Sequence, residues 1–539
     1  MHPSTDQLGR CLGDALEHLV PVKFKNCRDL AECRPGDAVL SLSGHDNVLR
    51  ELVKRRLRHF HVMGRPVGLR SDDEGEPVRF ADSLYLNELL RGRTIPHQVL
   101  FNLEPVPMES GDEVLAHYGD RPVWVLRRTD GLAAQIVAAR LPELGQAKQL
   151  FDYLNGYHYI QLLPLLHFLR EIAADIDWIR PPVRACFTFD DPNLHWPAYG
   201  FLSYRELFRQ ARKDRFHISL ATIPLDVWGP HSGAVTLIKE NGEHVSLLIH
   251  GNNHTRNEFG HAGTRQRYLS MLAQSLRRIE WLEKVTGLHV DRVMVPPHEA
   301  LAAAVLAPLL ALGFEGASLS MWSLRHWNPG REWPCTFGLE VAESTDGGFP
   351  ILGRYRLNGA CEGPVVISAL LGRPVILAEH HGAAASGLEL LSGAARVINS
   401  LASVKWCSIE MMLRSNYLHR REHATLWIRP YSRRIHLIVP EGVNQLVLAL
   451  AQHQRDEEAT EFSLIRRRPG TETIAAHIQP GVAIEVCPGE TIELVSMNLG
   501  AVDHHHLETA SSPVWAIYRR VLCEARDRVE VMKPWPRRI

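Results

Sequence analysis

The chain has 539 residues, more than one ordinary hydrophobic core can organise, and this length predicts about three domains. Its 60 Lys and Arg balance 61 Asp and Glu, so the bulk charge gives no reason to expect nucleic acid or an anionic membrane as a partner. The nine cysteines form no Cys-x-x-Cys pair, the N-terminus is polar, and no apolar run is long enough to cross a bilayer. These features predict a cytoplasmic protein without a disulfide framework or a thiolate zinc finger.

Residues 1–150 are predicted to form a small α/β domain. Ala38–Leu42 and Val123–Leu126 are short apolar runs typical of strands, and Asn47–Leu57 has the pattern of a helix. No nucleotide-binding loop is present in this part. A structural or substrate-presenting role is therefore the expectation for this domain.

Residues 151–180 are predicted to connect this domain to the next. The sequence is mainly helical in pattern from Leu144 to Ile172, and Pro164 is expected to kink or break the helix. The helix should end before the Pro181-Pro182 pair, because proline disfavours the helical conformation in the residue before it.

Residues 181–418 alternate between strand and helix patterns. Ser203 and Glu206 form a capping-box signature, and Gly287 stands where a helix is expected to end. Repeated strand–helix units predict a parallel sheet, either open or closed into a (β/α) barrel. The predicted strands are Val183–Phe189, His217–Ile223, Val245–Ile249, Arg292–Val295 and Pro374–Ala378.

Residues 419–539 are predicted to form a β-sandwich followed by a C-terminal tail. Short apolar runs bounded by Pro and Gly replace the helical period, as is typical of antiparallel sheets. The tail from Pro513 is expected to pack as a helix with a solvated basic end. The predicted strands are Ile435–Val439, Leu446–Leu450, Val482–Val486 and Thr491–Val495.

Polar clusters follow several strands of the middle part. In parallel α/β folds catalytic groups gather at the carboxyl ends of strands, so these clusters are hard to explain as packing. The clusters are Phe189-Asp190-Asp191, His250 to His254, Pro296-Pro297-His298-Glu299, and Leu377 to His381.

The first two clusters carry residues that suit a metal site. Adjacent side chains at a strand end point in different directions, so Asp191 can bind a metal while Asp190 acts as a base. His250 and His254, four residues apart at an expected helix start, would face the same side. Two imidazoles and one carboxylate suit a divalent ion, with Zn²⁺ favoured. The alternatives are a solvated pair of aspartates and, since the chain has 29 histidines, a chance spacing.

The last cluster offers a general acid. His380 follows an apolar strand, and the pKa of an imidazole lies near neutrality, so this side chain can donate a proton to a leaving group. A structural histidine is the alternative reading, and it is the preferred one for His381.

Taken in order, these clusters resemble the motifs of the polysaccharide deacetylase superfamily, carbohydrate esterase family four. Thr188 to Asp191 matches its T-F-D-D motif, His250 to His254 its H-x-x-x-H motif, and Leu377 to His380 its L-x-x-H motif. The resemblance covers residues 181 to 410 and implies a distorted (β/α) barrel. It further implies Asp190 as base, His380 as acid, and a divalent ion on Asp191 and the two motif histidines.

The third family motif is only partly present. The family has R-x-P-Y or R-P-P-Y, whereas this chain has Val295-Pro296-Pro297-His298. The arginine that orients the base in the family is therefore absent at this position. His298 is expected either to take over part of its role or to contact substrate.

Other residues near the motifs are candidate substrate contacts. His195, Trp196 and Tyr199 follow the aspartates, and aromatic faces suit sugar rings, although packing at the barrel rim is an equal alternative for Trp196 and Tyr199. The tract His504-His505-His506 is interpreted as a surface loop with adventitious metal affinity.

The predicted function is metal-dependent hydrolysis that removes acetyl groups from an N-acetylated carbohydrate or sugar derivative. The resemblance implies this substrate class, and the missing secretory signal favours a small or intracellular sugar over a cell-wall polymer. Two alternatives stay open: a hydrolase of a non-sugar amide or ester on the same barrel, and a non-catalytic multidomain scaffold.

Overall fold

The computed structural model describes residues 5–532 except 26, 28–29, 35–36, 42–54, 56, 64–75, 98–103, 130–131, 143, 145–148, 346–347, 451–461, 468–473, 497–499 and 512–513. The chain forms two compact units. Unit 1 contains Met1–Trp178 together with two later segments, Trp333–Glu340 and Ala360–Leu371. Unit 2 contains the rest of the chain. Within the described residues, no helix is both long enough and apolar enough to span a bilayer.

Unit 1 is built on a seven-stranded mixed sheet in the order β1-β2-β7-β6-β5-β3-β4. Three strands run parallel at one side, and hairpins make the other side antiparallel. The helix predicted over Asn47–Leu57 falls largely outside the described residues. The strands are β1 (Ala38–Ser41), β2 (Arg58–Val62), β3 (Val78–Phe80), β4 (Thr94–Ile95), β5 (Glu113–Tyr118), β6 (Arg121–Thr129) and β7 (Leu132–Val137), and the helices are α1 (Thr5–Leu19), α3 (Leu163–Ile172) and α9 (Glu362–Leu371).

The long connecting helix predicted from Leu144 does not form over its described residues. Only a single 3₁₀ turn, Leu150–Asp152, precedes α3, which begins at Leu163. Pro164 lies in the first turn of α3, where its missing N–H costs no hydrogen bond. The proline therefore starts a helix here, and the prediction that it kinks or breaks one was wrong.

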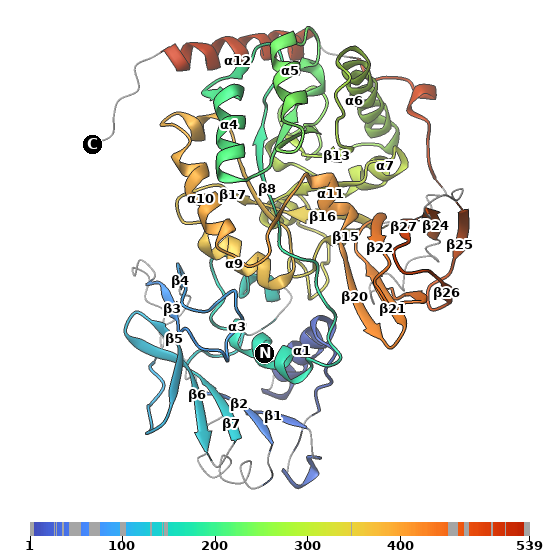
Figure 1. Ribbon diagram of the computed structural model, residues 1–539. Helices are drawn as coiled ribbons and strands as arrows, with labels where there is room; N and C mark the ends of the chain where they lie inside the picture. The colour runs from blue at the N-terminus through green and yellow to red at the C-terminus, as the bar shows by residue number, and fades with distance from the viewer. Residues whose placement is uncertain are drawn as a thin grey trace. The chain divides into compact units, whose positions relative to one another are not determined.

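Unit 2 contains a nearly closed, barrel-like parallel sheet (Figure 1). Its parallel strands follow the order β16-β14-β13-β12-β11-β8-β18-β17, with β15 (Glu343–Thr345) antiparallel at one end and β19 (Lys405–Trp406) beside β8. The parallel strands are β8 (Arg184–Asp190), β11 (Ile218–Thr222), β12 (Val245–Ile249), β13 (Val293–Met294), β14 (Gly316–Leu319), β16 (Phe349–Gly353), β17 (Tyr355–Arg356) and β18 (Val375–Glu379).

One residue brings the two ends of this parallel sheet together. Strand β16 ends at Gly353 and strand β17 begins at Tyr355, yet the two strands lie at opposite ends of the strand order. Arg354 alone joins them, and a single residue spans at most about 4 Å between neighbouring Cα atoms. The sheet must therefore curl round until its ends meet at Arg354.

Capping residues set the ends of two helices in the barrel. The Ser203 side chain accepts a hydrogen bond from the Glu206 amide at the start of α4 (Tyr204–Asp214), as the capping box predicts. Helix α6 (Arg265–Thr286) ends at Gly287 with φ 68°, a left-handed conformation that glycine adopts without strain. Figure 1 shows α4, α5 (Ser232–Glu240) and α6 next to one another on the outside of the sheet. The remaining helices are α7 (Leu306–Ala311), α8 (Met321–His326), α10 (Glu389–Asn399) and α11 (Ile409–Arg414).

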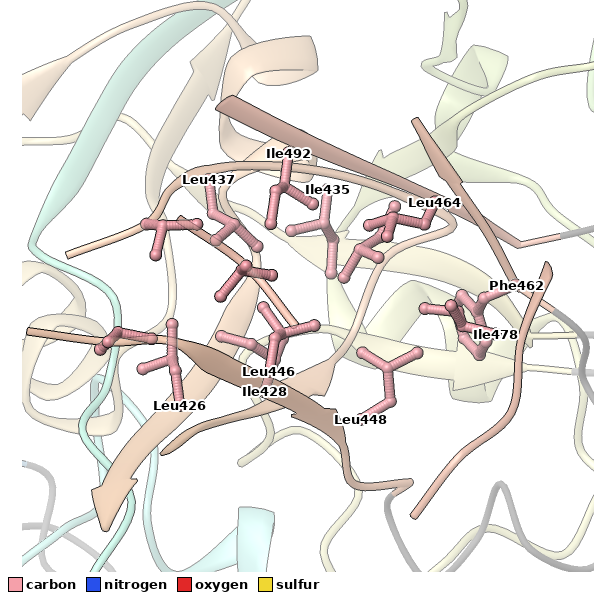
Figure 2. Close-up of a cluster of buried hydrophobic side chains, with 14 residues drawn as sticks. Leu426, Ile428, Ile435, Leu437, Leu446, Leu448, Phe462, Leu464, Ile478 and Ile492 are labelled. Carbon is pink, nitrogen blue, oxygen red and sulfur yellow. The ribbon is translucent and has the colours of Figure 1, made fainter. Parts of the chain in front are cut away.

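The C-terminal part of unit 2 contains two four-stranded sheets that share one apolar core (Figure 2). The first has the order β20-β21-β23-β26 and the second the order β22-β27-β24-β25. Strands β21 and β23 pair in parallel, so the first sheet is mixed and not purely antiparallel as predicted. The strands are β20 (Tyr417–Glu422), β21 (Thr425–Pro430), β22 (Arg434–Ile438), β23 (Gln445–Leu448), β24 (Phe462–Arg467), β25 (Ile474–Ile478), β26 (Ala483–Glu485) and β27 (Thr491–Ser496), and helix α12 (Val514–Met532) follows.

Strand β22 offers a matched test of this core. Ile435 is 0% exposed and Ile438 is 69% exposed on the same strand. Ile435→Ala should destabilise the protein by about 2–5 kcal/mol, because it removes buried methyl groups and leaves a cavity. Ile438→Ala should change stability by less than about 0.5 kcal/mol. Urea denaturation midpoints measure both, and equal midpoints for the two variants would contradict this packing.

Candidate metal centre

The four motif clusters lie at the same end of the barrel sheet. They follow strands β8, β12, β13 and β18, all of which run parallel within one continuous order. Because the carboxyl ends of parallel strands share one edge, residues far apart in the sequence meet there. The structure thus brings Asp190, Asp191, His250, His254 and His298 into one cluster.

Asp191, His250 and His254 converge on a single point. The Asp191 Oδ1 atom lies 3.4 Å from His250 Nε2 and 3.1 Å from His254 Nε2. Donor atoms that share one tetrahedral Zn²⁺ at about 2.0 Å lie about 3.3 Å apart. The three side chains form one of the groups of potential ligand atoms found among the described residues.

Two of these donor atoms have the character of metal ligands. Asp191 Oδ1 and His250 Nε2 are buried, and neither has a hydrogen-bond partner within the described part of the chain. His250 Nδ1 lies 2.8 Å from the Val295 carbonyl oxygen, so Nδ1 carries the hydrogen and Nε2 keeps its lone pair. A buried polar atom without a hydrogen-bond partner destabilises the fold, and a cation at this point would satisfy both Asp191 Oδ1 and His250 Nε2. The residues therefore fit a divalent ion.

The loop that carries the two histidines is held by a buried carboxylate. Glu258 accepts hydrogen bonds from the backbone amides of Asn252, Asn253 and His254 at 2.7, 3.1 and 3.2 Å. His254 has φ 53°, so residues 250–254 form a loop and not the expected helix start. The imidazoles face one another because Glu258 gathers the amides, not because of helical periodicity.

The asparagines between the two histidines fasten this loop to helix α6. Arg278 donates to the Asn252 and Asn253 side-chain oxygens at 2.7 and 2.9 Å, and Asn252 donates to Gln274 at 2.9 Å. The spacing of the two histidines gave no indication of this role for the asparagines. A polar pair between two candidate ligands was the signal for this role.

Asp190 is clamped by an arginine from the barrel closure. Arg354 donates to both carboxylate oxygens of Asp190 at 2.9 and 2.7 Å, and its Nε donates to Glu299 at 2.9 Å. Arg354 and Asp190 are 3% and 4% exposed. Burial alone would raise the pKa of Asp190, but the Arg354 guanidinium holds that pKa below its ordinary value. Arg354 thus supplies the contact that the third motif lacks, and sequence reasoning did not find it.

His380 lies on the exposed side of the cluster, directly after β18. The Glu379 carboxylate raises the pKa of His380, burial opposes the rise, and Asp190 and Asp191 add to it. Arg356 holds Glu379 in turn, with Nε 2.7 Å from Oε2. A raised pKa favours the protonated imidazole, which is the form that a general acid requires.

His298 stands next to the ligands. Its ring centroid lies 5.1 Å from that of His254, and burial lowers the pKa of His298. Eight non-glycine residues in the described chain have positive φ, and Asp191, His254, His298 and Glu299 account for four of them. Such conformations cost on the order of 1–3 kcal/mol each and concentrate at functional sites.

The other predicted contacts separate into exposed and buried side chains. Trp196 is 50% exposed and His195 is partly exposed, so both are accessible to a ligand. Tyr199 is 2% exposed and donates to Asp527 of α12 at 3.2 Å, which favours its packing alternative. His381 is buried, its ring edge-on to Tyr199, in agreement with a structural role.

Helix α12 contributes to the site in a way that the sequence did not indicate. Arg519 donates to the His254 carbonyl oxygen, and Arg520 binds Asp226 through Nε at 2.9 Å and Nη2 at 2.5 Å. Two consecutive arginines on a helix carry no local signal for such contacts. They attach the end of the chain to the loops that hold the candidate ligands.

Comparison with known proteins gives matches among solved structures only. No family model and no curated protein matches the chain. A family 4 carbohydrate esterase from Streptomyces lividans in complex with acetate matches at 13% identity and TM-score 0.26, over 42% of this chain and 93% of its own. The catalytic domain of a peptidoglycan N-acetylglucosamine deacetylase from Eubacterium rectale matches at 13% identity and TM-score 0.23. The match covers 44% of this chain and 94% of that domain.

A third match extends over most of the chain. The carbohydrate deacetylase Agd3 is similar over 90% of this chain and 97% of its own length, at 8% identity and TM-score 0.45. All three of these matches lie below 25% identity and below a TM-score of 0.5. At these identities and TM-scores, the activity of this chain has to be argued from its own residues.

The neighbouring aspartates provide the sharpest test of the metal centre. Asp191→Asn should lower bound Zn²⁺ at this centre by at least about tenfold, because it removes the charged ligand, whereas Asp190→Asn should retain it. Metal content after dialysis measures both, after the metal retained by His250→Ala, the reference for a lost ligand, is subtracted. Equal metal loss in the two aspartate variants would show that the carboxylates do not divide these roles.

Proposed function

We propose that this chain is a metal-dependent deacetylase that hydrolyses the amide of an N-acetylated sugar derivative. The observation that carries the proposal is the convergence of Asp191, His250 and His254 beside a second, clamped carboxylate, Asp190. A solvated strand-end pair needs neither buried, unpartnered donor atoms nor strained backbone. A vestigial scaffold would have no reason to keep an acid, a base and three ligands at one sheet edge.

Asp190 is suited to the role of base. A divalent ion bound to the three ligands would supply Lewis acidity towards a water molecule and the acetyl carbonyl. Asp190 is ionised because Arg354 favours its charged form, so it can accept a proton from the water that attacks the carbonyl carbon. Both carboxylate oxygens are held by Arg354, which fixes their direction towards the reacting atoms.

His380 is suited to the role of acid. As the carbon–nitrogen bond breaks, the departing amine takes a proton from the imidazolium, and the products are a free amine and acetic acid, which loses its remaining proton to solvent as acetate. The Glu379 carboxylate raises the pKa of the imidazole and orients the ring through Nδ1, which lies 3.5 Å from Oε1. The proton taken by Asp190 and the proton given by His380 balance over one turnover.

The role of Arg354 can be tested by a conservative change. Arg354→Lys should lower kcat/KM about tenfold or more with metal content unchanged, because one ammonium cannot bind both Asp190 oxygens and Glu299 together. Arg414→Lys is the matched control, since Arg414 makes a similar two-atom contact with Glu315 away from the site. Unchanged kcat/KM in Arg354→Lys would remove Arg354 from the mechanism.

The role of His380 predicts a pH dependence. The imidazole must be protonated to act, so activity should fall as pH rises through its pKa, which Glu379 raises above the ordinary value of 6.5. His380→Ala should lower kcat roughly 100-fold and abolish this alkaline limb. His381→Gln should keep the limb. A limb that disappears only in the His381 variant would assign the acid to His381.

The substrate class rests on the family resemblance and on the rim of the site. Trp196 is 50% exposed, with the Arg528 guanidinium 5.3 Å from its ring centre and the His231 ring stacked at 5.9 Å. An indole can pack against the apolar face of a sugar ring, which would here replace one of these neighbours. His195 and His298 are polar neighbours that can hydrogen-bond hydroxyl groups. These residues support a short N-acetylhexosamine compound as substrate.

Acetate release from a substrate panel tests the proposal. N-acetyl sugars should release acetate, and Asp190→Asn should abolish the release while the protein retains its metal. O-acetyl sugars and simple non-sugar amides complete the panel. Release from the non-sugar amides alone would replace the sugar assignment with the other hydrolase reading. No release from any compound by the metal-loaded protein would favour the scaffold.

A further inference from the structure

The histidine tract after the sandwich meets a carboxylate from helix α6. Glu280 Oε1 lies 2.8 Å from His504 Nε2, and Glu280 Oε2 lies 3.4 Å from His505 Nε2. The two imidazole rings are 4.1 Å apart between centroids. The tract, interpreted from sequence as a surface loop, is thus a short 3₁₀ turn whose first two side chains converge on one helix residue.

From this convergence we infer that Glu280, His504 and His505 form a second divalent-metal site, which favours Zn²⁺. Two imidazole nitrogens and a carboxylate are borderline ligands, and together with water they complete a tetrahedral shell. The 3.4 Å between His505 Nε2 and Glu280 Oε2 is close to the roughly 3.3 Å expected between two ligand atoms of one tetrahedral ion. The 2.8 Å separation is shorter, so metal binding would widen it by about half an ångström, and His504 Nε2 is a buried atom without a hydrogen-bond partner among the described residues.

The backbone beneath the two histidines is fixed before any ion binds. Arg277, one turn from Glu280 on α6, donates Nη2 to the carbonyl oxygens of His504, His505 and Leu507 at 2.7–2.8 Å. The Asp503 carboxylate accepts the His505 amide at 2.9 Å and caps the turn. A preformed backbone lowers the entropy that binding must overcome, and a chance pair of surface histidines lacks such support.

The site lies in the segment that connects the sandwich to α12, so an ion bound there would restrain that segment. Residues 500–511 lead from the sandwich towards α12. Two hydrogen bonds hold this segment to the barrel helices: the Val502 amide donates to the Ala311 carbonyl oxygen, and the Gln274 side chain donates to the Ala510 carbonyl oxygen. Helix α12 in turn binds the loops of the first centre through Arg519 and Arg520. An ion on Glu280 and the two histidines would fasten this segment to α6 and thereby hold α12 in place. The inference concerns structure and does not depend on the proposed activity.

Metal stoichiometry tests the site. In a His250→Ala/His254→Ala background, which disables the first centre, the full chain should still bind about one Zn²⁺ after dialysis. Adding His504→Ala/His505→Ala, or Glu280→Gln, should abolish that binding. His506→Ala is the matched control, because its imidazole is 86% exposed and pairs with Asp503 outside the cluster. Equal Zn²⁺ in all these variants would overturn the inference and leave only adventitious binding.

Hydrogen exchange tests the fastening separately. Zn²⁺ should slow amide exchange in residues 500–511 and in α12 in the first-centre background and in its His506→Ala derivative. It should not do so in the His504→Ala/His505→Ala derivative. If Zn²⁺ binds with the predicted ligand dependence but leaves exchange in both segments unchanged, the site holds metal without fastening the segment, and that part of the inference is wrong.

Discussion

The buried ion pair between Arg354 and Asp190 connects the closure of the barrel to its chemistry. Arg354 is the single residue between β16 and β17, the end strands of the parallel order, so its backbone position is set by closure of the sheet. From that position its side chain reaches the carboxylate at the end of β8. Removing one partner of a buried pair costs about 3–5 kcal/mol, since the other charge is left without compensation. A change at Arg354 therefore affects both the sheet and the Asp190 carboxylate.

The metal centre depends on a second buried carboxylate that would not contact the metal. Glu258 gathers consecutive amides of the loop 252–254 and so accommodates the left-handed backbone of His254. Asp191 is likewise held at φ 80°, with its amide bound to Ala221 of the neighbouring strand. The parallel sheet and α6 supply the rigid support that these strained conformations need.

The end of the chain returns to the site that the middle of the chain builds. Arg520 and Asp226 form a buried pair, and Asp527 binds Tyr199, so α12 is attached to the loops after β8 and β11. The same helix carries exposed apolar residues, among them Trp515 and Tyr518. The barrel motifs, the segment 500–511 and α12 thus form one connected arrangement, and the inferred second metal would strengthen its middle link.

The sequence by itself determined the local features of this protein. Ser203 capped its helix and Gly287 ended another as predicted, because capping depends on residues within one turn. The five strands predicted for the barrel domain lie within one or two residues of their observed positions, since buried parallel strands are continuous apolar runs. The order of the motifs placed Asp190, Asp191, His250 and His254 after those strands, where the structure has them.

Only the tertiary structure decided which distant residues meet. Arg354 and Asp190 are 164 positions apart, and no local pattern marks an arginine that will close a barrel. The helices expected from Leu144 and at His250 failed because propensity is a weak signal, and the gathering of amides by Glu258 overrides it at His250. His504 and His505 looked like an isolated surface tract because Glu280 lies more than 200 residues earlier. Contacts of this range are set by packing of the whole chain, which the sequence encodes but does not display locally.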